Sequence, residues 1–301
     1  MAKVASAWSP GHITGFFVVK ESSDPLVTGS LGAGVNIRRG VTTVVSAESG
    51  GEADVTIRIN GKELEAPTSM MVVNMALQRS DSRPKITIDH RCEVPIGAGF
   101  GSSGAGALSL ALAINEALDL GLSKLEAAQI AHVAEVVCRT GLGTVAAETV
   151  GGVELRLAPG APGIGDVKQI EVQGDYVVPC LSYSPIFTES ILANRERASR
   201  LADLGKIRLD EFLESPTVQN LLRVSQRFAF ATGLVSRRVE QVMLEAKSKG
   251  FICSMAMLGE SVFSIVERGQ APVLMDIFTK CAGSDGISFL SEIAFEGARL
   301  L

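Results

Sequence analysis

Apolar and polar positions alternate along some stretches of the chain and recur at helical spacing along others. Alternation and β-branched runs predict strands, whereas a repeat of three to four residues predicts helices. Strands are expected over residues 4–8, 16–20, 42–47, 55–60, 85–90, 153–157, 170–172, 176–181, 251–258, 261–267 and 287–295. Helices are expected over 69–78, from after 103 to about 120, and over 123–139, 194–200, 217–231, 236–249 and 272–281. A further helix is expected between the glycines at 141–143 and those at 151–152, and another is expected to start at 188–192.

Local signals sharpen this pattern. Asn60-Gly61 is a hairpin turn signal, and Ser123 with Glu126 three residues later predicts a capping box. The strands and helices do not alternate regularly, which favours an α+β fold over a doubly wound sheet. A Pro/Gly-rich break at 159–165 is a candidate linker, and two domains are expected, residues 1–175 and 176–301.

Composition narrows the class of protein. The 301 residues are 46% hydrophobic and 20% charged, enough for a packed core, and the net charge of -5 argues against a nucleic-acid partner. No apolar run reaches the roughly 18 residues of a membrane span. Five scattered cysteines without a CxxC pair disfavour a disulfide scaffold and fit a reducing cytoplasm, and three histidines make a histidine-rich metal site improbable.

Residues 95–104 (PIGAGFGSSG) combine a strand end, a Gly-Ser loop and a helix start. Free backbone N–H groups and the helix dipole make such a loop an anion site, which predicts phosphate binding. The GxxxxGK[ST] loop is excluded because its lysine is absent. A dinucleotide fingerprint matches Gly99 to Gly104, but no second strand follows at the required place, and a tight turn without a ligand is the plain alternative.

The same segment resembles the second motif of the GHMP kinases, P-x-G-x-G-L-G-S-S-A, with Phe100 in place of Leu and Gly104 inserted before Ala105. Ser9-Pro10-Gly11-His12 resembles their N-terminal motif, and 251–263 resembles their third, glycine-poor here. The resemblance implies ATP-dependent phosphorylation of a small alcohol and an α+β GHMP kinase fold: a ribosomal protein S5 domain 2-like N-terminal domain and a ferredoxin-like C-terminal domain. The residues that it implies for nucleotide binding are Pro95, Gly97, Ala98, Gly99, Gly101, Ser102 and Ser103.

On the expected helix 123–139, His132, Glu135 and Arg139 share one face by their spacing. A solvated ion-pair stripe is one interpretation. The resemblance implies instead that Glu135 and Ser103 hold Mg²⁺ and that the substrate lies near His132 and Arg139. It also places His12, in a turn, and Ser30, in the glycine-rich 29–34 segment expected to be a loop, on the substrate side. The alternatives are a structural histidine that caps nearby backbone and a flexible turn without a ligand. Arg156, on the strand face shared with Glu154, is either a surface arginine or a carboxylate-binding one.

The main departure from the family pattern is Thr144, which stands where many GHMP kinases have a catalytic aspartate. Threonine is not a base at neutral pH, and Glu148, one turn later, substitutes only if it faces inward. Phosphoryl transfer depends mostly on positioning and charge neutralisation, so direct transfer without a base is the hypothesis, with Thr144, Ser103 and Glu135 as the catalytic set.

The acceptor expected here is a small carboxylate-bearing alcohol. The alternatives are an acceptor of the homoserine or mevalonate type, and a sensor that binds nucleotide without catalysis. The expected partners are the small-molecule substrate, ATP and Mg²⁺, with no nucleic acid and no membrane, and a homodimer is possible.

Overall fold

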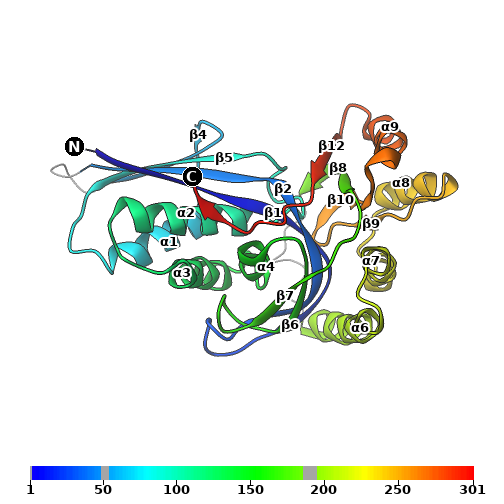
Figure 1. The fold of residues 1–301 in the computed structure, drawn as a ribbon, viewed down its shortest axis with the longest axis horizontal. Helices are drawn as coiled ribbons and strands as arrows, with labels where there is room; N and C mark the ends of the chain where they lie inside the picture. The colour runs from blue at the N-terminus through cyan, green and yellow to red at the C-terminus, as the bar shows by residue number, and fades with distance from the viewer. Residues whose placement is uncertain (1, 49–53, 186–194) are drawn as a thin grey trace.

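The computed structural model describes residues 2–48, 54–185 and 195–301 (Figure 1). The helix start expected at 188–192 lies outside the described residues. The strands are β1 Ala2–Lys20, β2 Gly29–Glu48, β3 Val55–Ile59, β4 Lys62–Glu63, β5 Lys85–Cys92, β6 Val153–Ala158, β7 Asp166–Ile170, β8 Tyr176–Pro185, β9 Ser254–Met255, β10 Gly259–Phe263, β11 Val266–Glu267, β12 Ile287–Glu292 and β13 Arg299–Leu300. The helices are α1 Pro67–Leu77, α2 Ser102–Ala117, α3 Lys124–Val137, α4 Thr144–Val150, α6 Arg195–Glu214, α7 Val218–Thr232, α8 Arg237–Ser248 and α9 Ala271–Ala282.

The first sheet has the strand order β13-β1-β2-β5-β3-β4, with β6 pairing β2 and β7 pairing β6. Helix α2 packs against β1 and β2 on one face of this sheet, and α1 and α3 pack against α2 on the same side (Figure 1). Helix α2 lies in the centre of this layer because nearly all of its residues are small or aliphatic and buried. It therefore buries apolar surface on every side, and its N-terminus is fixed at the end of β5.

Strands β1 and β2 are one long antiparallel pair, from Ala2 opposite Glu48 to Lys20 opposite Gly29. The expected break at 9–12 is wrong, since these residues continue β1 through a register shift between Pro10 and Gly11. The loop expected at 29–34 is also wrong, because these residues form the first part of β2, where glycine lets the neighbouring backbone approach closely. A Cβ on Gly32 would lie 2.1 Å from the Phe16 carbonyl oxygen.

The second sheet has the order β11-β8-β10-β9, with β12 on β8. Helices α6 to α9 lie along the outer side of this half (Figure 1). Three edge-to-face ring pairs among the described residues join the halves: Phe16 with Phe212 at 5.6 Å, Phe17 with Phe228 at 5.4 Å and Phe100 with Phe289 at 5.2 Å between ring centres. The two sheets and the irregular order of strands and helices confirm the α+β class.

The predicted turn at 60–61 and the predicted capping box at 123–126 are confirmed, whereas the predicted linker at 159–165 is not. Asn60 and Gly61 both have positive φ in the β3–β4 turn, and the Ser123/Glu126 capping box starts α3. Residues 159–165 connect β6 to β7, which pair antiparallel, so this break is a turn within one sheet and not a linker. The division at 175/176 stays a prediction. The last strand, β13, returns to pair with β1.

Candidate active site

A cavity of about 1090 Å³ opens beside the N-terminus of α2. Its walls come from β1 and β2, the segment before α1, the loop after β5, the ends of α3 and α4, and residues 257–258. Chain segments that are far apart in the sequence therefore contribute side chains to a single hollow.

The loop between β5 and α2 forms one wall of this cavity. Gly97, Gly99 and Gly101 have φ of +70°, +87° and +69°, a conformation that glycine adopts without strain. Gly101 is the N-cap of α2 and offers no side chain, so the first N–H groups of the helix are left for a ligand. Of the seven residues expected to bind nucleotide, Gly97, Gly99, Gly101, Ser102 and Ser103 line the cavity, whereas Ala98 is buried behind it and Pro95 lies beside it.

The segment expected as the third motif holds this loop in place. A Cβ on Gly259 would lie 1.9 Å from the Ala98 carbonyl oxygen, so only glycine allows the contact. The Ser261 hydroxyl donates a hydrogen bond to the same oxygen at 2.8 Å. The loop expected to bind phosphate is therefore fixed from behind by the C-terminal half.

Glu135 faces the loop from α3. The Ser103 hydroxyl donates to Glu135 Oε1 at 2.6 Å, and the Thr140 hydroxyl donates to the same oxygen. Burial raises the pKa of Glu135, and these two hydrogen bonds oppose that shift. The side chain is only 2% exposed, which excludes a solvated ion-pair stripe on this helix. A nearby cation would favour the charged carboxylate.

Helix α3 ends at Val137, so the expected extension to Arg139 is wrong. The Thr140 N–H donates to the Glu135 carbonyl and the Arg139 N–H to the Val136 carbonyl, the pattern of a Schellman ending. Arg139 occupies the left-handed position, φ +56°, where a residue other than glycine costs about 1 kcal/mol. Its side chain lines the cavity, which gives a reason for arginine at a strained position.

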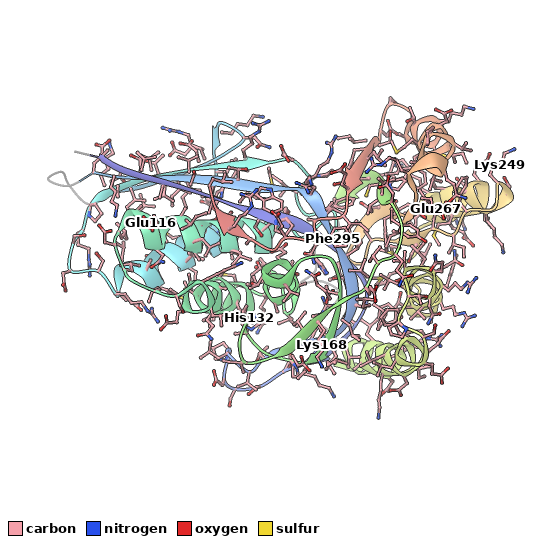
Figure 2. The ribbon with its side chains drawn as sticks, in the orientation of Figure 1. Glu116, His132, Lys168, Lys249, Glu267 and Phe295 are labelled. Carbon is pink, nitrogen blue, oxygen red and sulfur yellow. The ribbon has the colours of Figure 1, made fainter. Side chains whose placement is uncertain are left out.

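His132 does not point into the cavity. It lies on the side of α3 near the β1–β2 connection (Figure 2), and its Nε2 donates to the Thr28 carbonyl at 2.9 Å. Burial lowers the pKa of His132, which keeps the ring neutral. The contact fixes the chain two residues before Ser30, so His132 reaches the expected substrate region only through the backbone.

The buried charges of the opposite wall are on β1 and β6. Glu154 Oε1 accepts from Arg156 Nη1 at 2.8 Å and from His12 Nε2 at 2.9 Å, and all three side chains are at most 2% exposed. The strand alternation correctly placed Glu154 and Arg156 on one face, but Glu154 itself was missed. Arg156 and His12 both line the cavity, and Arg156 Nε has no hydrogen-bond partner among the described residues.

Ser30 is buried beside this group, at the start of β2. A Cβ on Gly143 would lie 2.2 Å from the Ser30 hydroxyl oxygen and 3.2 Å from Arg156 Nε. Ser30 and Arg156 are therefore both packed against Gly143, one residue before Thr144. Both line the cavity, which excludes a surface position for Arg156.

Thr144 begins α4 and lines the cavity next to the loop. Glu148, one turn later, is completely buried behind the loop, where a Cβ on Gly101 would lie 2.7 Å from its Oε1. Neither of its carboxylate oxygens has a hydrogen-bond partner in the described part of the chain, and burial raises its pKa well above 4.5. Since Glu148 does not border the cavity, it does not replace the missing aspartate.

The far end of the cavity was not anticipated. Ile59, Pro67, Ser69, Cys92 and Ile96 line it together with His90. His90 Nε2 contacts the Ser69 hydroxyl at 3.1 Å and its Nδ1 the Thr43 hydroxyl at 2.8 Å, and burial lowers its pKa to about 4. These residues come from separate strands and helices, so no local motif marks them.

Comparisons with known proteins agree with this geometry. The family model for the GHMP kinases N terminal domain matches residues 69–152. A pantoate kinase from Methanocaldococcus jannaschii is 34% identical over 262 residues, 87% of this chain and 92% of that protein. A pantoate kinase from Thermococcus kodakarensis is 34% identical over 269 residues, 88% of each chain. A solved structure described as a phosphotransferase related to the CoA biosynthesis pathway has a TM-score of 0.89 at 30% identity, covering 99% of this chain and 98% of its own.

The fold and the loop thus define a small-molecule kinase of the GHMP class, as the motifs predicted. Within that class, the segments SPGHITGFF, GSLGAG and TGLG to GGVELR resemble archaeal pantoate kinases. The chain belongs to the pantoate kinase family, because relatives more than 30% identical match nearly its whole length.

Proposed function

We propose that this protein transfers the γ-phosphoryl group of ATP to the hydroxyl of pantoate, giving 4-phosphopantoate for coenzyme A biosynthesis. The observation that carries the assignment is the position of Arg156, a buried guanidinium on the cavity wall together with Ser30. An arginine in such a site binds a carboxylate, which pantoate supplies. The close relatives act on the same substrate by name.

The loop at 97–103 receives the triphosphate through its backbone amides and the dipole of α2. The base and ribose occupy the far end of the cavity, between Ile59, Pro67 and Ile96, which supplies the apolar contacts that a purine needs. The substrate half consists of His12, Ser30, Arg139 and Arg156, and His132 supports it through Thr28.

Ser103 and Glu135 are the residues that would hold Mg²⁺. Their oxygens lie 2.6 Å apart on the cavity wall, and hydroxyl, carboxylate and phosphate oxygens are the hard ligands that this ion prefers. Across the described residues, no group of three or more His, Cys, Asp or Glu side chains could hold a metal by itself. The ion would therefore arrive with the nucleotide and neutralise charge on its phosphates.

A cytoplasmic enzyme is proposed from the thiols, since all five cysteines are free and two are fully buried. No helix in the described ranges has the length and apolarity needed to cross a membrane. A homodimer stays a prediction from the family resemblance.

The test is ADP release from the purified enzyme with ATP, Mg²⁺ and a panel of pantoate, homoserine and mevalonate. Pantoate should give a kcat/KM at least about 100-fold above the others. All three acceptors carry a carboxylate, but homoserine adds an ammonium group and mevalonate has a longer chain, so neither should place its hydroxyl as pantoate does. ADP release that depends on homoserine or mevalonate but not on pantoate would replace the assignment. Nucleotide binding without turnover on any member would indicate a sensor.

A further inference from the structure

The reaction releases a proton from the substrate hydroxyl, and the cavity contains few groups that can accept it. Among the described lining residues, Glu21 and Glu65 are exposed at the rim. Glu135 already accepts two hydroxyl hydrogen bonds beside Ser103. His90 lies at the far end, where hydroxyl groups lie 2.8 and 3.1 Å from its two ring nitrogens, closer than the 3.4 Å between His12 Nδ1 and the Thr14 hydroxyl. His12 is the remaining candidate.

His12 lies where the two substrates would meet. Its backbone N–H donates to the Phe100 carbonyl at 3.0 Å, so this residue is attached directly to the phosphate loop. Its ring contacts Glu154, which also binds Arg156 on the carboxylate side of the cavity. A hydroxy acid held by Arg156 with its hydroxyl toward the loop would lie beside His12, since all three line the same cavity.

The ring orientation is fixed. Glu154 is acceptor-only when ionised, as its ion pair with Arg156 requires, so the proton of the neutral ring lies on Nε2. A Cβ on Gly34 would lie 2.5 Å from His12 Nε2, which shows that β2 packs tightly against the ring. Nδ1 then carries a lone pair, and the Thr14 hydroxyl lies 3.4 Å from it.

We infer that His12, oriented by Glu154, accepts the proton of the substrate hydroxyl at Nδ1 and is a catalytic residue of this kinase. This inference rests on the proposed function. A carboxylate that fixes the tautomer of a histidine is the arrangement that produces a general base in unrelated hydrolases. Here it takes the place of the aspartate that Thr144 replaces.

In the proposed step, the O–H bond of the substrate breaks as a bond from hydrogen to Nδ1 forms. The hydroxyl oxygen forms a bond to the γ-phosphorus, and the bond from that phosphorus to the β–γ bridging oxygen breaks, leaving its electron pair on ADP. The imidazolium, stabilised by Glu154, then releases its proton to solvent. Burial lowers the pKa of His12, with Glu154 opposing, so the free enzyme holds a neutral ring ready to accept.

The first experiment measures steady-state kinetics of His12→Ala and His12→Gln with pantoate. We expect kcat to fall about 100-fold, the lower end for general-base catalysis because the transition state is loose, with the KM for ATP changed less than threefold. Imidazole added to His12→Ala should raise kcat about tenfold. Any loss in the matched variant His90→Ala should not respond to imidazole.

A kcat within threefold of wild type in both variants would overturn the inference, and so would a higher KM at unchanged kcat, since that shows binding alone. A fall in kcat that imidazole does not restore would show a structural role. If the wild-type enzyme uses another acid of the panel, the proposed function fails, and the same variants are assayed with that acid.

A second measurement does not depend on turnover or on any variant folding. In ¹⁵N-labelled wild-type protein at neutral pH, His12 should show a protonated Nε2 and an unprotonated Nδ1. A proton on Nδ1, or on both nitrogens, would contradict the inference whichever acceptor the enzyme uses.

Discussion

The two ends of the reaction centre bind their ligands with different groups, backbone amides at the phosphate end and buried side chains at the acceptor end. The phosphate end is a run of seven neighbouring residues, Gly97 to Ser103, in which backbone amides are the ligands, and its charged side chain, Glu135, comes from α3 and contacts Ser103. The acceptor end is a buried ionic group, His12, Glu154 and Arg156, from two strands that are not neighbours in the sequence. Backbone geometry suits a ligand common to all ATP-dependent kinases. Charged side chains at fixed positions suit the acceptor acid, the substrate that differs from one kinase family to another.

The largest expected effect is at the phosphate end. Glu135→Gln should lower kcat by at least about 1000-fold at saturating Mg²⁺, because a neutral amide neither binds the ion well nor balances its charge. The measurement is ADP release over a Mg²⁺ titration. Activity within tenfold of wild type would remove Glu135 from the proposed metal site.

The loop itself is tested by two glycines with the same backbone conformation. Gly101 and Gly233 have φ of +69° and +68°, but a Cβ meets Glu148 at 2.7 Å in the first and nothing within 4 Å in the second. Gly233→Ala should cost about 1 kcal/mol of unfolding free energy and leave nucleotide affinity unchanged. Gly101→Ala should cost about 2–3 kcal/mol and weaken binding of an ATP analogue about 30-fold. Calorimetry provides both quantities, and equal effects at the two sites would contradict the packing argument.

At the acceptor end, Arg156→Lys keeps the charge but loses the planar guanidinium. We expect the KM for pantoate to rise about 10- to 100-fold while the KM for ATP stays within threefold, because an ammonium group cannot reproduce a two-point contact. Kinetics with each substrate varied in turn check this. A parallel rise in both constants would mean that the two ends are not separable.

Glu148 lies behind the phosphate loop and should affect stability more than turnover. Its folded-state pKa is raised, so stabilisation by the neutral acid is complete below about pH 4.5 and is lost as the pH rises through the folded pKa. Glu148→Gln should remove this decline and raise the unfolding free energy at pH 8 by about 1 kcal/mol relative to wild type. Urea unfolding of both proteins at pH 5 and pH 8 isolates the effect, since other titrating groups cancel in the difference. A larger benefit at pH 5 would show the opposite sign.

The smallest effect is expected at Thr144. Thr144→Ala should keep turnover within about threefold of wild type, because threonine is not a base and the loose transition state needs little help at this position. A loss as large as that of Glu135→Gln would refute direct transfer without an aspartate.

The contrast between a contiguous loop and a group of side chains from separate strands explains which parts of the site could be predicted from the sequence. The loop was predictable because three glycines, two serines and a helix start are adjacent, and their chemistry follows from local geometry. Glu154 was missed because an acid on a strand has no local signal; only the β1–β2–β6 pairing places it against His12. The stretch 29–34 was misjudged as a loop, since glycine marks close backbone contact as well as flexibility.

His132 illustrates an intermediate case. Helical spacing grouped it correctly with Glu135, yet spacing does not tell which neighbour a face meets. The carbonyl that it binds belongs to a turn 104 residues away. His132 thus binds the chain close to Ser30 and does not line the cavity, and its role toward the substrate stays a prediction.

The contact of Ser261 with Ala98 joins residues 163 positions apart. During synthesis on the ribosome, the glycine turn before α2 emerges long before the strand that supports it. A nascent chain that ends before Gly259 therefore lacks the contacts that hold the phosphate loop in its binding conformation. Tight ATP binding should begin only when the strand that contains Gly259 and Ser261 has emerged.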